Sequence, residues 1–358
     1  MVDMKKVFSV FKGRRVFITG HTGFKGSWLA YLLHRVGADV MGFSLPPSGD
    51  KNNFSLLKLD GKVKHVIGDI RDLSVLNESI TKFQPEFVFH LAAQALVRTS
   101  YDDPVDTFST NIQGSVNLLE SVRKCNSIRS LVYITSDKCY ENVEWIWGYR
   151  ENDSLGGIDP YSASKAAAEI VFSCYERSFF NSNPKLGVAS ARAGNVIGGG
   201  DWAVDRIIPD CIRAIESDGS IFLRNPFSTR PWQHVMEPLS GYLTLAFNLY
   251  HEPKKYSGAW NFGPSTQEIK TVKDVAQIMV EHIGRGRIEF LDSISNVHEA
   301  NLLQLNCDKA HQLLNWHPRW TVDETLDATA DWYKTVLNGG DAEEITISQL
   351  NVFFRDTI

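Results

Sequence analysis

Short runs rich in β-branched and aromatic residues alternate with longer amphipathic runs through the first half of the chain. The short runs have the length and composition of strands, and the longer ones gather apolar side chains on one side of a helix. The expected strands are residues 14–19, 39–44, 64–68, 87–92, 130–136 and 187–193, and the expected helices are residues 24–36, 71–83, 105–124 and 161–180. This alternation predicts a parallel sheet that helices cover on both faces.

The turn after the first expected strand carries the spaced glycines Gly20, Gly23 and Gly26. Gly20 permits a tight turn, Gly23 lets the backbone approach a pyrophosphate, and Gly26 lets the following helix pack against the sheet. The N–H groups and dipole at the start of that helix favour phosphates. We therefore predict a dinucleotide-binding loop. Lys25 either adds charge near the pyrophosphate or is a solvated lysine at the start of the helix.

Right-handed crossovers turn the first half into an α/β, doubly wound parallel Rossmann-type sheet. After about residue 195 the pattern loosens, because glycines at 198–200 and several prolines punctuate shorter elements. We expect a dinucleotide-binding domain at residues 1–194. Residues 195–358 are expected to form mainly a smaller C-terminal substrate-binding lobe, interleaved with the sheet near residues 258–264.

Composition excludes several classes of partner. The net charge of −5 without a dense basic tract argues against nucleic acid. No run reaches the roughly 18 to 20 apolar residues of a membrane span, and residues 1–15 lack a signal-peptide stretch. The cysteines are scattered, so we expect reduced thiols in a cytoplasmic protein and no metal site. They are Cys125, Cys139, Cys174, Cys211 and Cys307.

Tyr161 and Lys165 are four residues apart in an expected helix, so their side chains lie on the same face. A cationic amine beside a phenol favours the phenolate and lowers the pKa of tyrosine from about 10. Such a phenol can take a proton from a sugar hydroxyl near neutral pH. Amphipathic helices often produce this spacing by chance, so the pair alone does not identify a function.

The choice between NAD and NADP is weakly specified by the residues themselves. Rossmann proteins that favour NAD usually place an acid about 20 residues beyond the glycine loop. That point falls near residues 43–46, which contain neither an acid nor an arginine for a 2′-phosphate.

The fifth expected strand ends in Ser136, Asp137 and Lys138. Ligands of parallel α/β sheets bind beyond the carboxyl ends of the strands, so these side chains would face the cofactor. With the glycine spacing and the Tyr161–Lys165 pair, they make the chain resemble the extended short-chain dehydrogenases/reductases, the NAD-dependent epimerase/dehydratase family.

The resemblance covers nearly the whole chain, from about Gly13 to Trp332, and implies NAD as the cofactor. The residues that it assigns to the cofactor are Gly20, His21, Thr22, Gly23, Phe24, Lys25, Gly26, Asp69, Ile70, Leu91, Ala92, Ala93, Gln94, Tyr161 and Lys165. Asp69 and Ile70 would contact adenine, and the competing interpretation of Asp69 is an acid that starts a helix. Asn111 matches a family residue packed behind the site.

The nucleotide-sugar 4,6-dehydratases of this family commonly carry Thr-Asp-Glu at the strand end, with Asp as acid and Glu as base, whereas the epimerases lack the pair. This chain keeps Asp137 and has Lys138 in place of Glu. The Asp-Lys version is similar to that of dehydratases of CDP-glucose, and it also occurs in inverting UDP-N-acetylglucosamine 4,6-dehydratases.

The resemblance then implies a role for each residue. Tyr161 removes the 4-hydroxyl proton during oxidation at C4, Ser136 orients the oxygen, and Lys165 holds the phenolate and the cofactor ribose. Lys138 removes the C5 proton, and Asp137 protonates the departing 6-hydroxyl.

The resemblance also implies CDP-glucose as substrate and a homodimer formed through helices 105–124 and 161–180. Arginine forks suit a pyrophosphate. The residues placed at the sugar nucleotide are Asn195, Arg206, Arg224 and Arg230. Trp202 or Trp232 either stacks on the base or belongs to the core. The alternatives are a 4,6-dehydratase or 4-epimerase of a UDP-, dTDP- or GDP-linked sugar, or a non-catalytic NAD(H)-binding protein.

Overall fold

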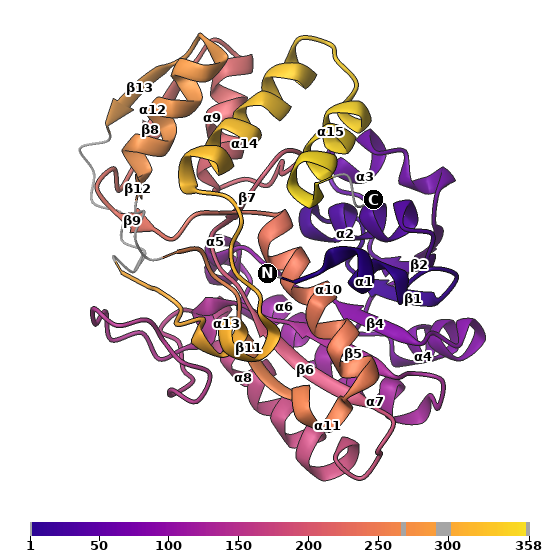
Figure 1. Ribbon diagram of the computed structural model, residues 1–358. Coiled ribbons are helices and arrows are strands. Elements are labelled where there is room, and N and C mark those ends of the chain that lie inside the picture. Colours follow the sequence, from indigo (N-terminus) through magenta and orange to yellow (C-terminus); the bar gives the residue numbers. More distant parts are fainter. Residues whose placement is uncertain (1, 266–269, 291–301, 356–358) are drawn as a thin grey trace.

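The computed structural model describes residues 2–265, 270–290 and 302–355. Its centre is a seven-stranded sheet with the order β11-β6-β5-β4-β1-β2-β3 (Figure 1). The strands are β1 (Arg15–Thr19), β2 (Asp39–Ser44), β3 (Lys64–Ile67), β4 (Phe87–His90), β5 (Ser130–Ile134), β6 (Gly187–Arg192) and β11 (Gly258–Asn261). Every neighbouring pair is parallel, so the expected Rossmann-type fold class is confirmed.

Successive side chains of a strand point to opposite faces of the sheet, and each face has its own apolar core. In β1, Val16 and Ile18 belong to one core and Phe17 to the other. Helices α2 and α10 cover the first core, and α4, α7 and α8 cover the second. Their bounds are α2 (Phe24–Arg35), α4 (Leu73–Phe83), α7 (Gly114–Lys124), α8 (Pro160–Tyr175) and α10 (Met236–His251).

The two long helices expected from the sequence are present, and each contains a π-helical turn. The first runs through α6 (Pro104–Phe108), the π turn η2 (Ser109–Gln113) and α7. The second continues from α8 into the π turn η4 (Glu176–Phe180). Such turns occur often at functional sites, and η2 places Asn111 in the interior.

The remaining elements are mostly short and lie at the carboxyl ends of the sheet strands or around the sheet (Figure 1). The strands are β7 (Val196–Ile197), β8 (Ser220–Leu223), β9 (Thr229–Arg230), β10 (Gln233–His234), β12 (Lys270–Thr271) and β13 (Arg287–Phe290). The helices are α1 (Met4–Ser9), α3 (Asn53–Leu56), η1 (Leu59–Gly61), α5 (Val97–Asp102), η3 (Asp137–Cys139), α9 (Ile207–Glu216), α11 (Pro253–Tyr256), α12 (Val272–Ile283), α13 (Asp308–Leu314), α14 (Val322–Leu337) and α15 (Ala342–Phe354).

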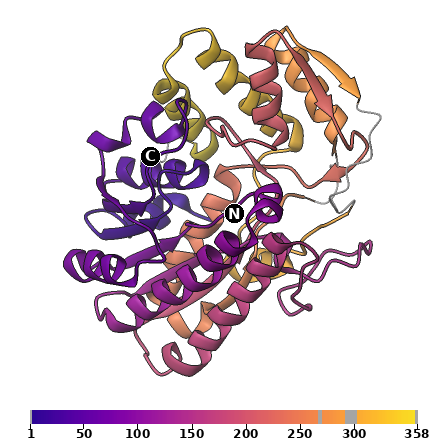
Figure 2. The ribbon, with the colours of Figure 1, turned by 180° about the vertical axis from the view of Figure 1, so that it is seen from behind.

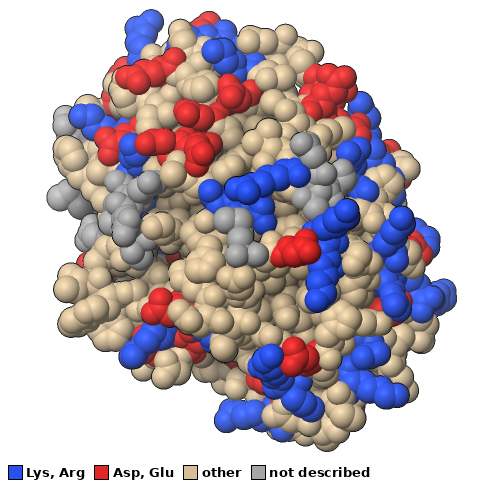
Figure 3. All heavy atoms as spheres, in the orientation of Figure 1, with Lys and Arg blue, Asp and Glu red and all other residues tan. Residues whose placement is uncertain are grey.

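The chain returns to the main sheet at β11, which pairs with β6. Within the described ranges, no helix has the length and apolar character that crossing a membrane requires. Acidic side chains gather over the upper part of the face in Figure 3, where α12 and α14 lie, and basic ones lie toward the right and bottom. No single sign of charge dominates this face.

Candidate active site

The glycine loop joins β1 to α2 in close contact with the segment after β4. Gly20 has a φ of +76°, and a Cβ there would lie 2.7 Å from the backbone nitrogen of Ala92. A Cβ at Gly26 would overlap the carbonyl oxygen of Gly20. Helix α2 starts without a side-chain cap, so the N–H groups of its first turn are left for a ligand. The loop therefore fits the pyrophosphate of a dinucleotide.

The side chains of His21 and Thr22 hold this loop in place. The His21 Nε2 lies 2.6 Å from the Nδ1 of His65, and burial followed by the His65 charge lowers the pKa of His21 to about 3. The Thr22 hydroxyl lies 2.8 Å from that of Ser44 at the end of β2. Both side chains are thus engaged in contacts within the protein, with His21 buried and Thr22 partly exposed.

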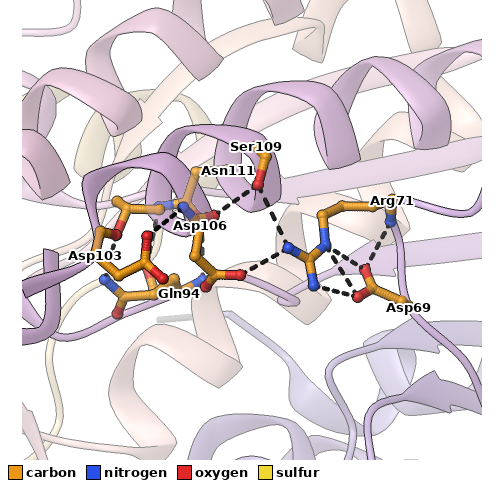
Figure 4. Close-up of polar contacts among 8 residues, drawn as sticks. Asp69, Arg71, Gln94, Asp103, Asp106, Ser109 and Asn111 are labelled. Atoms are coloured by element: carbon orange, nitrogen blue, oxygen red, sulfur yellow. Dashed lines mark hydrogen bonds and ion pairs between the residues drawn. The ribbon is translucent and has the colours of Figure 1, made fainter.

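An ionic network that the sequence analysis missed surrounds Asp69 (Figure 4). The Arg71 guanidinium donates to Asp69, with an Nη2–Oδ2 distance of 2.6 Å, and to Asp106 at 2.7 Å. These hydrogen bonds from Arg71 hold the pKa of Asp69 below its usual range. Ile70 is buried against Gly114 of α7. Arg71 lies only two positions from the expected adenine contact Asp69, well beyond residues 43–46, where an arginine for a 2′-phosphate would be expected.

Asn111 links the segment after β4 to α8. Its Oδ1 accepts from the Gln94 N–H, and its Nδ2 donates to the Gln94 carbonyl, each at 2.9 Å (Figure 4). The same Nδ2 donates to the Ser164 hydroxyl at 2.8 Å. Residues 91–94 are partly exposed and lie beside the glycine loop. The Leu91 N–H donates to the carbonyl of Thr19, the residue before Gly20, at 3.1 Å. Asn111 thus packs behind the site as a structural support.

The polar residues after β5 form one compact turn, η3. The Ser136 hydroxyl donates to Asp137 Oδ1 at 2.9 Å, and the Asn195 amide donates to Asp137 Oδ2 at 3.3 Å. A Cβ at Gly194 would overlap the Asp137 carboxylate, so the position requires glycine. Asp137 is 3% exposed, and Lys138 is half-buried.

Tyr161 and Lys165 share one face of α8, and both are buried. The expected lowering of the tyrosine pKa is not found. Burial raises the pKa of Tyr161 to about 12, against the opposing hydrogen bond from Ser136. Lys165 Nζ lies over the tyrosine ring, 6.0 Å from its centre. Burial, then the charge of Lys25, lowers the pKa of Lys165 to about 8.

A cavity of about 610 Å³ brings together the predicted substrate residues and most of the predicted catalytic ones, whereas Lys165, the loop glycines, Asp69, Ile70 and residues 91–94 do not line it. Its lining includes Phe24, Lys25, Ser136, Asp137, Lys138, Tyr161, Asn195, Arg206, Arg224 and Arg230. Lys25 therefore faces this cavity and is not a solvated lysine at the surface. Burial, then the charge of Arg206, lowers its pKa to about 8.

The arginines in this cavity are held by aspartates that the sequence did not single out. Arg206 pairs with Asp201 at 2.8 Å, and Arg224 pairs with Asp205 at 3.0 Å. Both aspartates also line the cavity. Asp201 lies five positions before Arg206 and Asp205 lies 19 positions before Arg224, and neither spacing forms a pattern that could have identified these aspartates. Trp232 lines the cavity, whereas Trp202 packs against Trp332 and Tyr333.

The glycine loop and a buried Tyr-Lys pair beside one cavity lined by charged side chains define a dinucleotide-dependent enzyme of the short-chain dehydrogenase/reductase type. The model of the family described as GDP-mannose 4,6 dehydratase matches residues 17–329. The chain belongs to this family.

Relatives and solved structures agree with that membership. The chain is 51% identical to the CDP-glucose 4,6-dehydratase of Salmonella typhimurium over 92% of this chain and 93% of that protein. The structure of Thermus thermophilus UDP-glucose 4-epimerase in complex with NAD has a TM-score of 0.77 and 26% identity, covering 89% of this chain and 99% of that one. Streptomyces venezuelae DesIV, a dTDP-glucose 4,6-dehydratase with NAD and TYD bound, has a TM-score of 0.78 and 22% identity over 91% and 99%.

Proposed function

We propose that this chain is a nucleotide-sugar 4,6-dehydratase that converts CDP-D-glucose to CDP-4-keto-6-deoxy-D-glucose and water. The observation that carries the proposal is the meeting of Tyr161, Asp137 and Lys138 in one cavity. A 4-epimerase has no use for such an acid–amine pair, because it breaks no C–O bond. The 51% identity to a CDP-glucose 4,6-dehydratase supports the choice of base and sugar.

The proposed cofactor is NAD, held by the glycine loop and the uncapped start of α2. Lys165 makes no hydrogen bond or ion pair within the described residues, so its ammonium is available to ribose hydroxyls. NAD bound there would supply a hydride acceptor for C4 and a hydride donor for C6, so there would be no net oxidation. The NAD in the Thermus thermophilus epimerase structure supports this choice of dinucleotide.

Tyr161 takes the proton of the 4-hydroxyl, and Ser136 holds the same oxygen by a hydrogen bond. Because burial holds the phenol pKa near 12, a cation must approach the phenol before it can act near neutral pH. Lys165, one helical turn along α8, is the residue placed to do so.

Two residues of the η3 turn, Asp137 and Lys138, carry out the elimination of water. The 4-ketone makes the C5 proton acidic, and Lys138 removes it while Asp137 protonates the 6-hydroxyl, which leaves as water. The C5–H and C6–O bonds break, and a C5–C6 double bond forms. When hydride reaches C6, the double bond is consumed and a proton returns to C5.

Replacing Lys138 with methionine tests whether Lys138 is the base that removes the C5 proton. The variant should still oxidise C4, but deuterium from D₂O should enter C5 at a rate lowered by about 10² or more, because the base is gone. Mass spectrometry of the sugar measures the deuterium. Lys185→Met, at an exposed lysine outside the cavity, is the matched control. Full deuterium incorporation in Lys138→Met would refute the assignment.

A product assay decides the substrate. Keto-sugar formation is measured with CDP-, UDP-, dTDP- and GDP-glucose under the same conditions, and CDP-glucose should give the highest kcat/KM. A preference for another base, or formation of the C4 epimer, would favour the corresponding alternative. Tight NAD(H) binding without turnover of any sugar would indicate a binding protein.

We also propose that the protein is a homodimer. Helices α6, α7 and α8 lie side by side on the face shown in Figure 2. That part of the chain exposes large apolar side chains, among them Val105 at 77% and Ile170 at 58%. An apolar surface of this kind is typical of a subunit interface. Ile170→Glu should give a monomer in analytical ultracentrifugation, whereas Val352→Glu, at an exposed residue of α15, should leave the assembly unchanged.

We propose that residues 1–194 bind the dinucleotide and that residues 195–358 bind mainly the sugar nucleotide. The arginines after residue 195 that line the cavity support this assignment. A cytoplasmic location is proposed from the cysteines, all of which are free thiols.

A further inference from the structure

A buried ion pair lies beneath the proposed catalytic residues. Glu169 of α8 and Arg192 at the end of β6 are 2% and 4% exposed as side chains, and their Oε2 and Nη2 atoms are 2.7 Å apart. Glu169 lies one helical turn beyond Lys165. The proposed mechanism uses neither residue, and neither lines the cavity.

Glu169 holds Thr135, two residues before the η3 turn. Its Oε1 accepts a short hydrogen bond from the Thr135 hydroxyl, and its Oε2 accepts from the Ser190 hydroxyl at 2.8 Å. Thr135 directly precedes Ser136. The carboxylate therefore ties the end of β5 to the helix that carries Tyr161 and Lys165.

Arg192 holds the residue just after the η3 turn. Its Nη1 donates to the Tyr140 hydroxyl at 2.7 Å and to the Glu151 carbonyl at 3.1 Å. The Tyr140 hydroxyl in turn donates to Asn261 Oδ1 at 2.8 Å. The ion pair thus holds the chain on both sides of residues 136–138, because Glu169 binds Thr135 and Arg192 binds Tyr140.

The charges of this pair are retained in the fold. Burial raises the pKa of Glu169, but the charge of Arg192 and the hydrogen bonds to the carboxylate outweigh burial and leave the pKa below its ordinary value. A buried pair gives little net stability compared with apolar residues of similar volume, whereas removal of one partner alone is strongly destabilising. Its value to the protein must then lie in the geometry that it imposes.

We propose that the Glu169–Arg192 ion pair is a positioning element that sets residues 136–138 against the Tyr161–Lys165 face of α8. Neither residue contacts the substrate. The inference rests on the proposed function, because it assigns the acid, the base and the tyrosine to one reaction. It predicts that turnover depends on the pair even where stability does not.

The test compares two variants with the wild-type holoenzyme. Glu169→Gln removes the charge and keeps the shape, and Glu169→Leu/Arg192→Met removes both charges together and so leaves neither one unpaired. In both variants kcat should fall by about 10-fold to 100-fold while KM stays within about twofold, because misplaced groups slow chemistry more than binding. Glu237→Gln, which alters another buried carboxylate far from η3 in sequence, should keep kcat.

Hydrogen exchange supplies a readout that needs no substrate. Residues 135–140 should exchange about tenfold faster in the double variant, with β1 unchanged and the unfolding midpoint close to wild type. A double variant of wild-type stability with wild-type kcat and wild-type exchange at residues 135–140 would overturn the inference. A wild-type enzyme that turns over no nucleotide sugar would instead refute the proposed function, and the exchange measurement would still decide the positioning role.

Discussion

Tyr161→Phe is expected to lower kcat by about 10³-fold, within the range of about 10² to 10⁴ that general acid–base groups contribute. Phenylalanine keeps the ring in its buried position on α8 and removes only the hydroxyl that takes the proton of the 4-hydroxyl. The loss should fall on kcat and kcat/KM together, because the proton transfer is made only in the transition state. Initial rates of keto-sugar formation measure it.

Tyr175→Phe is the matched control, because Tyr175 lies on the same helix and its side chain packs against Phe179 and Phe180. It should leave kcat within about twofold of wild type. The wild-type kcat/KM should rise with pH through the neutral range, since the raised phenol pKa keeps Tyr161 protonated at lower pH. Activity of Tyr161→Phe within tenfold of wild type would exclude Tyr161 as the base.

Acid should destabilise the fold strongly, because three histidines are buried in the neutral form. His21, His90 and His234 are at most 2% exposed, and burial lowers each pKa to about 3. In the unfolded chain these histidines have pKa values of about 6.5. Between about pH 3 and pH 6.5 the unfolded chain therefore binds more protons than the folded one, so stability falls as pH falls below about 6.5. At pH 5 the loss is about 2 kcal/mol for each histidine, at about 1.4 kcal/mol per pH unit.

One buried carboxylate opposes this trend. Burial raises the pKa of Glu237 to about 7, so the folded state binds the extra proton between about 4.5 and 7 and gains about 2 kcal/mol from pH 7 to pH 5. Against about 6 kcal/mol lost at the three histidines, the net loss from these four groups is about 4 kcal/mol. Urea unfolding at the two pH values measures it. Equal free energies of unfolding at pH 7 and pH 5 would contradict neutral buried histidines.

Much of the fold follows from local sequence. The expected strands 39–44 and 187–193 match β2 and β6 to within one residue. Such strands can be recognised from sequence because the pattern of apolar residues that marks them involves only neighbours along the chain. The helix expected at 105–124 is present, but its π turn at η2 has no sequence signal. The resemblance placed Asn111 behind the site, but its hydrogen bonds to Gln94 and Ser164 emerged only from the structure.

The sequence was enough to predict the sheet and the glycine loop. It also predicted that Tyr161 and Lys165 share a helix face and that residues 136–138 lie at the end of a strand. It could do so because spacing along a helix and position at a strand end are local properties. The tertiary structure was needed to show that Lys25 faces the cavity, that Arg71 also binds Asp106 on α6, and that the phenol pKa is raised. These properties depend on burial and on partners from distant segments, which no spacing along the chain encodes.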